Sequence, residues 1–189
     1  MNEWGENDKN VIGKGRLGFQ NITTYSVKDR KNLVTIDNML VPGTEESIQW
    51  GGEDFDELAD RIIRARENKR PVILSMGAHV IKNGLSLYII ELVKKGLVTH
   101  VASNGAGSIH DFELSYNGGT SEDVPTAIED GSFGMWEETG RWMNEALQEG
   151  AKKGLGYGES LAVYMDKNQE RFPYRDYCLL YQAYKNGVP

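Results

Sequence analysis

Hydrophobic residues recur with a helical period in one segment of the chain and form short continuous runs in two others. In residues 54–66 they fall at the spacing of 3.6 residues per turn, with acids in the first turn and bases in the last. This pattern predicts a surface helix. The short apolar runs at 72–77 and 97–104 are typical of buried parallel strands. A helical pattern at 79–95, closed by Gly96, lies between them.

A strand, a helix and a second strand in this order predict a right-handed parallel crossover unit. We therefore expect an α/β fold, a Rossmann-like parallel sheet with flanking helices. Further helices are predicted near 109–116, 135–152, 157–170 and 174–186. The polar, glycine-bearing stretch 117–134 predicts loops that line a cleft. Residues 186–189 resemble a helix stop leading into another strand, so we expect the sheet to be incomplete at the C-terminus and the chain to be a partial copy of a longer domain.

Residues 1–32 are predicted to form an irregular N-terminal arm, and residues 33–189 the α/β domain. Within the arm, residues 13–18 read GKGRLG and match the dinucleotide-binding pattern GxGxxG. That fingerprint needs a strand before it and a helix that opens within it, and neither pattern flanks these residues. We do not assign a site there.

The composition narrows the classes of partner and compartment. A formal net charge of −7 argues against electrostatically driven binding to nucleic acid or to an anionic membrane. The single cysteine, Cys178, lies in an apolar helical stretch and predicts a buried thiol in a reducing compartment. No apolar run reaches the roughly 18 residues of a membrane span, and no signal pattern opens the chain. We expect a cytoplasmic protein.

Ligands in open α/β sheets bind at the carboxyl ends of the strands, so the residues after the two predicted strands are the candidate site. The first end carries Gly77 and Ala78, and the second carries Ser103, Asn104, Gly105, Ala106 and Gly107. Glycines permit close backbone approach, and a helix start offers N–H donors to a phosphate or carboxylate. The alternative is that the glycines only shape a tight turn.

His79 and His110 fall at the same strand ends, and Asp111 follows His110 directly. An adjacent acid can orient a histidine as a general base, so these three residues are the candidate catalytic groups. Asp111 is equally explained as a helix cap. His100 lies within the strand pattern and is predicted to be buried and structural. The histidines and Cys178 lack the spacing of a zinc site, so no metal is expected.

Residues 71–111 resemble deoxyhypusine synthase, an NAD-dependent enzyme that transfers the aminobutyl group of spermidine to a lysine of a translation factor. After its first strand the family has TSN and a later glycine, where this chain has Gly77, Ala78, His79 and then Gly84. After the next strand the family has a threonine pair followed by AGGVEED, and this chain reads SNGAGSIHD at 103–111, with Gly107 and Asp111 matching. The resemblance implies NAD as cofactor, a small-molecule substrate and a homo-oligomer, a tetramer with active sites between subunits.

The chain departs from the family at positions that matter for chemistry. The two adjacent glutamates of the family's active site are Ile109 and His110 here, which puts spermidine as the substrate in doubt. The family's catalytic lysine follows a segment that corresponds to residues 184–189, so the chain is expected not to complete the reaction alone. The alternative is a non-catalytic assembly module whose Trp136, Trp142 and Tyr164 form a subunit interface.

Overall fold

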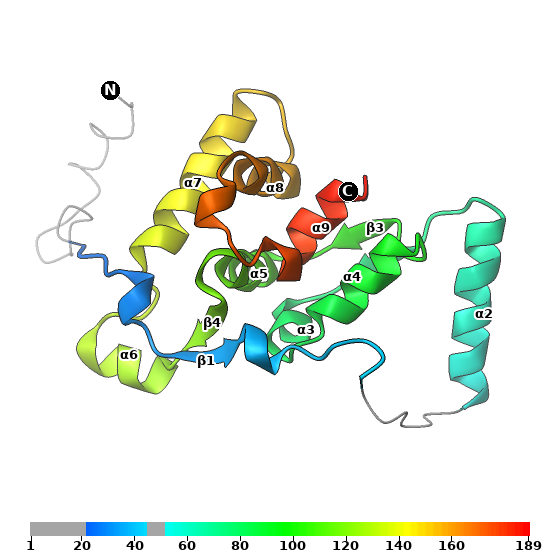
Figure 1. Ribbon diagram of the computed structural model, residues 1–189, viewed down its shortest axis with the longest axis horizontal. Coiled ribbons are helices and arrows are strands. Elements are labelled where there is room, and N and C mark those ends of the chain that lie inside the picture. The colour runs from blue at the N-terminus through cyan, green and yellow to red at the C-terminus, as the bar shows by residue number, and fades with distance from the viewer. Residues whose placement is uncertain (1–21, 45–51) are drawn as a thin grey trace, which may run out of the picture.

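The computed structural model describes residues 22–44 and 52–189 as a mixed α/β structure (Figure 1). Two two-stranded sheets are present in these ranges. β1 (Asn32–Thr35) pairs antiparallel with β4 (Gly119–Glu122), and β2 (Ile73–Ser75) pairs parallel with β3 (His100–Ala102). The parallel pair confirms that a strand, helix and strand crossover forms between residues 73 and 102. A larger Rossmann-like parallel sheet does not form within the described residues.

The helix predicted at 79–95 is two helices, α3 (Ala78–Lys82) and α4 (Ser86–Lys94). Gly84 separates them with φ +76°. A side chain at this position would collide with the backbone oxygen of Asn38, and the carbonyl of Gly84 accepts a 2.9 Å hydrogen bond from Leu40 N. The prediction of one continuous helix is wrong because Asn83 and Gly84 form a turn that packs against residues 38–40. The Asn-Gly pair is a local turn signal within the helical pattern.

The central helix α5 (Gly105–Asn117) begins earlier than the predicted 109–116 and contributes buried residues on several faces. It ends at Gly118, which has φ +64°. The stretch after it was expected to form cleft-lining loops, but it forms the buried strand β4 and the helix α6 (Val124–Asp130). The prediction is wrong because Thr120 and Glu122 of β4 find hydrogen-bond partners inside the protein, at Glu113 and Trp136.

Three C-terminal helices enclose the larger core: α7 (Glu137–Ala151), α8 (Tyr157–Lys167) and α9 (Leu179–Lys185). They match the predicted helices, except that α9 starts later and a short 3-10 turn precedes it. Phe112, Leu161, Met165 and Phe172 are fully buried between them.

The aromatic residues considered for a subunit interface belong to the interior of one chain. Trp136 and Tyr164 are buried, and Trp142 packs edge-on against Phe172 with 5.8 Å between ring centroids. The burial of Trp136 and Tyr164 favours the alternative that these aromatic residues belong to the core, while Trp142 is half-buried.

The described part of the predicted N-terminal arm packs against the body. Tyr25 N donates to Met135 O and Tyr25 O accepts from Glu137 N, both at 2.8 Å, while Val27 is buried. The GxGxxG match at 13–18 lies outside the described residues.

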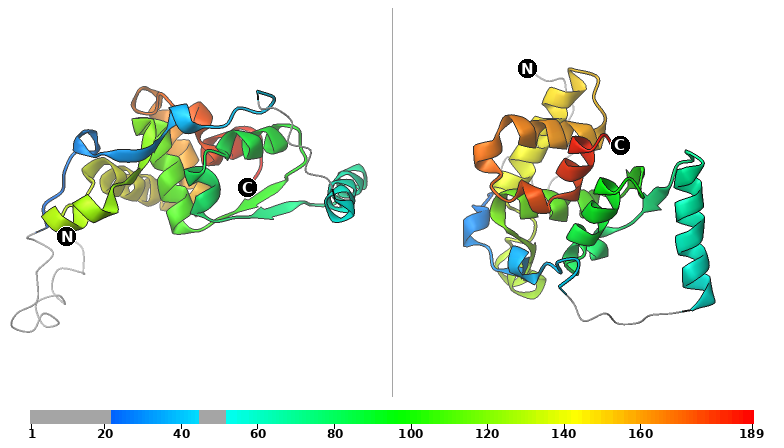
Figure 2. Two further views of the ribbon diagram at one scale, coloured as in Figure 1. Left: turned by 90° about the horizontal axis from the view of Figure 1, so that it is seen from below. Right: turned by 45° about the vertical axis from the view of Figure 1, so that its right-hand side comes forward.

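The predicted surface helix is confirmed as α2 (Glu53–Glu67), which stands apart from the body in every view (Figures 1 and 2). None of its residues is buried. Across residues 22–44 and 52–189, no helix combines the length and apolar character needed to cross a membrane.

Candidate functional site

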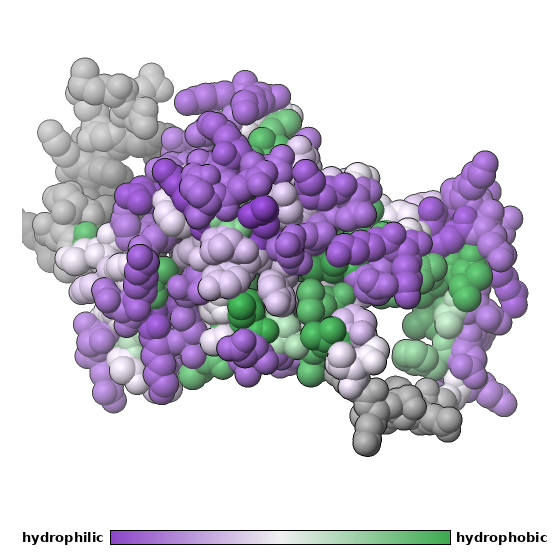
Figure 3. All heavy atoms as spheres, in the orientation of Figure 1, coloured by the Kyte–Doolittle hydropathy of each residue, from purple (hydrophilic) through white to green (hydrophobic). Residues whose placement is uncertain are grey.

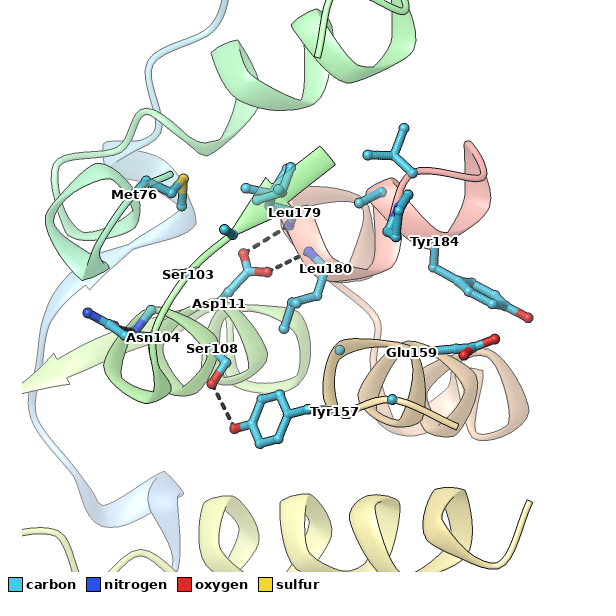
Figure 4. A pocket seen from close by; sticks show the side chains of 18 of the residues that line it. Met76, Ser103, Asn104, Ser108, Asp111, Tyr157, Glu159, Leu179, Leu180 and Tyr184 are labelled. Carbon is cyan, nitrogen blue, oxygen red and sulfur yellow. Dashed lines mark hydrogen bonds between the residues drawn. The ribbon is translucent and has the colours of Figure 1, made fainter. Parts of the chain in front are cut away.

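A cavity of about 890 Å³ opens beside the carboxyl end of β3 (Figure 4). Its walls come from the ends of β2 and β3, from α3, from the starts of α5 and α8, and from α9 with the residues that follow it. Its polar lining groups come from Ser103, Asn104, Ser108, Asp111, Tyr157, Glu159 and Tyr184. Its apolar lining comes mainly from Met76, Ile81, Val101, Leu179, Leu180 and Val188.

The N-terminus of α5 opens onto this cavity. Asn104 caps the helix, since its Oδ1 accepts a 2.9 Å hydrogen bond from Gly107 N. Gly105 and Ala106 are the first two helical residues, so their N–H groups have no acceptor one turn earlier in the helix. The positive end of the helix dipole therefore faces the cavity mouth.

The two glycines of this turn have different roles. A Cβ at Gly107 would collide with Ser103 Oγ, so the present position of the Ser103 hydroxyl depends on the glycine. A Cβ at Gly105 would have no atom within 4 Å, and Gly105 lines the cavity. Gly105 therefore leaves room for a ligand, whereas Gly107 leaves room for the Ser103 hydroxyl.

Ser108 and Tyr157 join α5 to α8 at the cavity wall (Figure 4). Ser108 Oγ donates to Gly105 O at 2.8 Å, so its only hydroxyl proton is in use. The 2.8 Å contact between Ser108 Oγ and Tyr157 Oη is therefore donated by the tyrosine. Tyr157 remains 48% exposed, which places a polar aromatic ring where a ligand would enter.

Asp111 lines the cavity, but its carboxylate is committed to α9 (Figure 4). Its Oδ1 accepts from Leu179 N at 2.9 Å, and its Oδ2 accepts from Leu180 N at 2.7 Å and from Cys178 Sγ at 3.1 Å. Burial raises the pKa of Asp111 to about 6, against the effect of these three donors. Of the two interpretations of Asp111, a catalytic acid or a helix cap, the structure favours the cap. The helix that it caps is α9 and not α5.

Cys178 is buried as predicted. Burial and the neighbouring Asp111 raise the pKa of its thiol well above the ordinary value, so the thiol stays protonated and donates to the carboxylate.

The cavity has few charged groups. Glu159, which is exposed, and Asp111 are its only ionisable carboxylates, and no lysine, arginine or histidine belongs to the described lining. An anionic group of a ligand would therefore be stabilised by the N–H groups at the start of α5, and apolar portions by the walls.

A second polar cluster lies away from the cavity and contains His110. Glu113 accepts two hydrogen bonds from the Arg30 guanidinium, at 2.7 and 2.9 Å, and one from Thr120 Oγ1 at 2.6 Å. Thr139 Oγ1 donates to the same carboxylate at 2.9 Å. His110 Nδ1 lies 2.7 Å from Thr120 Oγ1. Arg30, Glu113 and Thr120 are all buried.

The cluster determines the tautomer of His110. The Thr120 hydroxyl gives its proton to Glu113, so His110 Nδ1 must carry the proton that lies between the ring and Thr120 Oγ1. Burial lowers the pKa of His110, with the Glu113 carboxylate opposing that effect. The ring is therefore held as the neutral Nδ1–H form, with Nε2 as an acceptor.

The structure brings only part of the predicted site together. Ser103, Asn104, Gly105, Gly107 and Asp111 line the cavity; Gly77, Ala78, Ala106, His79 and His110 do not. The three proposed catalytic residues do not meet in one cavity: Asp111 lines it, His79 is exposed on α3, and His110 Nδ1 lies against Thr120. His100, expected to be buried, is exposed, because it starts β3 on the uncovered face of a two-stranded sheet.

Sequence reasoning missed the contribution of residues 156–159 and of α9 to the walls. The tyrosine between two glycines at 156–158 was the one local signal that could have indicated the former. Within the described ranges, no three His, Cys, Asp or Glu side chains are grouped as a metal site would require. No protein-family model and no curated protein matches the chain.

Proposed function

We propose that this chain binds a small organic ligand in the cavity beside β3, and that NAD is the ligand to test first. The observation that carries the proposal is the N-terminus of α5 facing a largely apolar cavity of about 890 Å³. Cavities of this size and character are typical of sites for small molecules and cofactors. The helix start supplies amide donors for a phosphate, and the open space at Gly105 lets it approach the backbone.

We also propose that the fold of this chain is related to the Rossmann-like folds. The parallel pairing of β2 and β3 supports this relationship. A second support is the 2.9 Å hydrogen bond from Val101 N to Pro189 O, because it lies at the edge of β3 that faces away from β2. Ligands of such folds bind outside the carboxyl ends of the strands, which is where this cavity lies. The likeness of residues 71–111 to deoxyhypusine synthase is the reason for choosing NAD.

The cavity supports binding better than it supports aminobutyl transfer from spermidine. When bound, NAD would supply hydride transfer; Ser103, Asn104 and Gly105 would hold its phosphates and the walls formed by α9 its apolar surface. Lysine is absent from the described lining, so no side chain there is suited to form an imine. Asp111 is committed to α9, which leaves Glu159 as the lining carboxylate able to accept a proton.

The test is thermal unfolding and calorimetric titration of the full chain with NAD, AMP and nicotinamide mononucleotide as separate ligands. A ligand that binds only the folded state stabilises it by about 2.7 kcal/mol at one hundred times its Kd. We expect NAD to raise the midpoint and AMP to raise it less. Absence of any shift with all three ligands would overturn the nucleotide assignment.

Gly105→Leu locates the site. A Cβ at position 105 has no protein atom within 4 Å, so the fold should persist. Because Gly105 lines the cavity, the added leucine side chain should exclude the ligand. Gly140→Leu is the matched control, because Gly140 is also helical, exposed and free of neighbours within 4 Å, but lies on α7. Equal binding by both variants would place the ligand elsewhere.

A further inference from the structure

Three arginines surround a shallow cleft at the C-terminal end of α2. The cleft has a volume of about 450 Å³ and is lined by Arg61, Arg64, Ala65, Asn68 and Arg70. Its lining therefore holds three cations and no carboxylate, in a chain whose formal net charge is −7. Hydrophilic residues gather at the end of α2 from which the chain turns toward β2 (Figures 1 and 3). The charge of the cleft is thus local and opposite in sign to that of the whole chain.

Helical spacing and the way α2 ends bring these side chains together. Positions 64, 65 and 68 are three, four and seven residues after position 61, which is the spacing of neighbours on one side of a helix. Lys69 then adopts φ +55°, and Arg70 N donates to Ala65 O at 2.7 Å, so the chain reverses and returns Arg70 to the helix. The left-handed residue of such a turn is usually glycine, because a side chain there is unfavourable. The guanidinium of Arg66 fixes the turn by donating to Arg70 O.

The three guanidinium groups keep donors available for a ligand. Arg70 bonds through its backbone N and O, and within residues 22–44 and 52–189 its guanidinium has no hydrogen-bond or ion-pair partner. Arg61 Nε donates to Glu57 at 2.9 Å, and Arg64 Nη2 lies 3.6 Å from Asp60. Each guanidinium has five N–H donors, so these exposed pairs occupy only part of them. A shared anion can therefore contact all three groups.

The helix dipole does not by itself explain this arrangement. Bases near a helix C-terminus are favourable, and the effect is confined to the last turn. Arg61 lies six residues before the end of α2 at Glu67, and Arg70 lies beyond that end. Both nevertheless line the same cleft. The dipole accounts for Arg64 and Arg66 in the last turn, but it does not require the other two arginines to converge.

From this convergence we propose that the cleft is a binding site for a small oligophosphate, held by Arg61, Arg64 and Arg70. The planar fork of a guanidinium matches two oxygens of a phosphate, and three such forks suit a ligand with several negative charges. The small volume and the acidic net charge favour a small ligand over nucleic acid, whose backbone would extend across an acidic protein. None of the lining residues of the cleft belongs to the cavity beside β3, so the two sites are separate.

Calorimetric titration of the full chain with tripolyphosphate at low salt tests the site. We expect one tripolyphosphate to bind per chain, with a Kd that rises as salt is added. Arg64→Gln and Arg70→Gln should each raise the Kd about fivefold, the contribution of an exposed ion pair. Their unfolding midpoints should be unchanged, because no residue of α2 is buried and Arg70 is exposed.

Arg141→Gln is the matched control. Arg141 is an exposed arginine that also pairs with a carboxylate one turn away, Glu137 at 3.1 Å, but it lies on α7. Its loss should leave the Kd for tripolyphosphate as in the wild type. Absence of binding to the wild type, or the same Kd for Arg70→Gln and Arg141→Gln, overturns the proposal.

Two further titrations identify the site and the class of ligand. Gly105→Leu, which obstructs the cavity beside β3, should bind tripolyphosphate as the wild type does. Loss of binding in this variant would assign the anion to the start of α5 and overturn the cleft. Tighter binding of a single-stranded oligonucleotide than of tripolyphosphate, weakened by Arg70→Gln, would overturn the small ligand in favour of nucleic acid.

Discussion

Arg30 and Glu113 form a bidentate ion pair with both side chains inside the protein, 3% and 4% exposed. The pair links the segment before β1 to the centre of α5, residues 83 positions apart in the chain. Thr120 and Thr139 complete the carboxylate's hydrogen bonds. The charge of Glu113 is therefore fully compensated, but only while every partner is in place.

Arg30→Met is expected to lower the free energy of unfolding by about 3–5 kcal/mol, because it leaves a buried carboxylate without its cation. Urea denaturation measures the change. Lys31→Met is the control: Lys31 pairs with Asp123 at 2.8 Å, but its side chain is 74% exposed, and such pairs contribute about 1 kcal/mol or less. Similar losses in the two variants would show that the buried pair is not a main support of the fold.

The free energy of unfolding should depend on pH through the titration of Asp111. Burial raises its pKa to about 6 in the folded protein, above the roughly 3.9 of an unfolded chain. The folded state then binds the proton more readily between these values, so this group's contribution to stability falls as pH rises from about 4 to 6 and is constant above.

Asp111→Asn removes that titration and one acceptor for the amides that open α9, at a cost of about 1–3 kcal/mol. The difference in unfolding free energy between wild type and Asp111→Asn should therefore be larger at pH 4 than at pH 7. Denaturant titrations at several pH values measure it. A difference that grows toward neutral pH would mean that the ionised carboxylate is the favoured form.

The His110 tautomer is open to direct measurement. Nitrogen–proton NMR of the imidazoles at neutral pH should show His110 as the neutral Nδ1–H form, because Thr120 can accept only from that nitrogen. Thr120→Val should release this preference and cost about 1–3 kcal/mol through the unpaired groups left behind. The exposed His79 serves as the internal reference and should keep its shifts. An Nε2–H form of His110 in the wild type would contradict the hydrogen-bond assignment.

The contact between α7 and α8 depends on the absence of a side chain at Gly150. A Cβ there would lie 2.5 Å from Ser160 Cβ and would collide with Ser160 Oγ. Gly150→Ala is expected to destabilise the protein by about 1–3 kcal/mol, as overpacking does. Gly140→Ala on the same helix meets nothing within 4 Å and should be neutral or stabilising by up to about 1 kcal/mol. Thermal unfolding of the two variants side by side measures the contrast.

Local hydrophobic periodicity was sufficient to predict the helices that expose a polar side, and the apolar runs were sufficient to predict the parallel strand pair. The helix predicted at 54–66 became α2, and the runs around Leu74 and Val101 became β2 and β3. It failed for β4, whose sequence GTSE contains no hydrophobic residue. Thr120 is buried there because Glu113 and His110 bind its hydroxyl. A strand whose interior contacts are polar has no signature in a hydrophobic pattern.

The sequence predicted the backbone turn of the candidate site but not the side chains that form the cavity walls. The turn from Ser103 to Gly107 lies at the cavity because a strand end followed by glycines is a local feature. Tyr157 and Leu180 arrive from helices fifty or more residues away, through tertiary packing that the sequence does not display. His110 was assigned to the site because it is near in sequence, yet one turn of a helix directs neighbouring side chains to different sides.

The helix α5 limits how this protein can be altered. One of its sides forms the floor of the cavity through Gly105 and Ser108, and another holds Glu113 in the buried ion pair. A ligand that shifted the start of this helix would strain the packing of residues from the other end of the chain. Directed evolution for a new ligand should therefore leave α5 and its partner Tyr157 untouched and vary positions 159 and 184, where the wall is exposed.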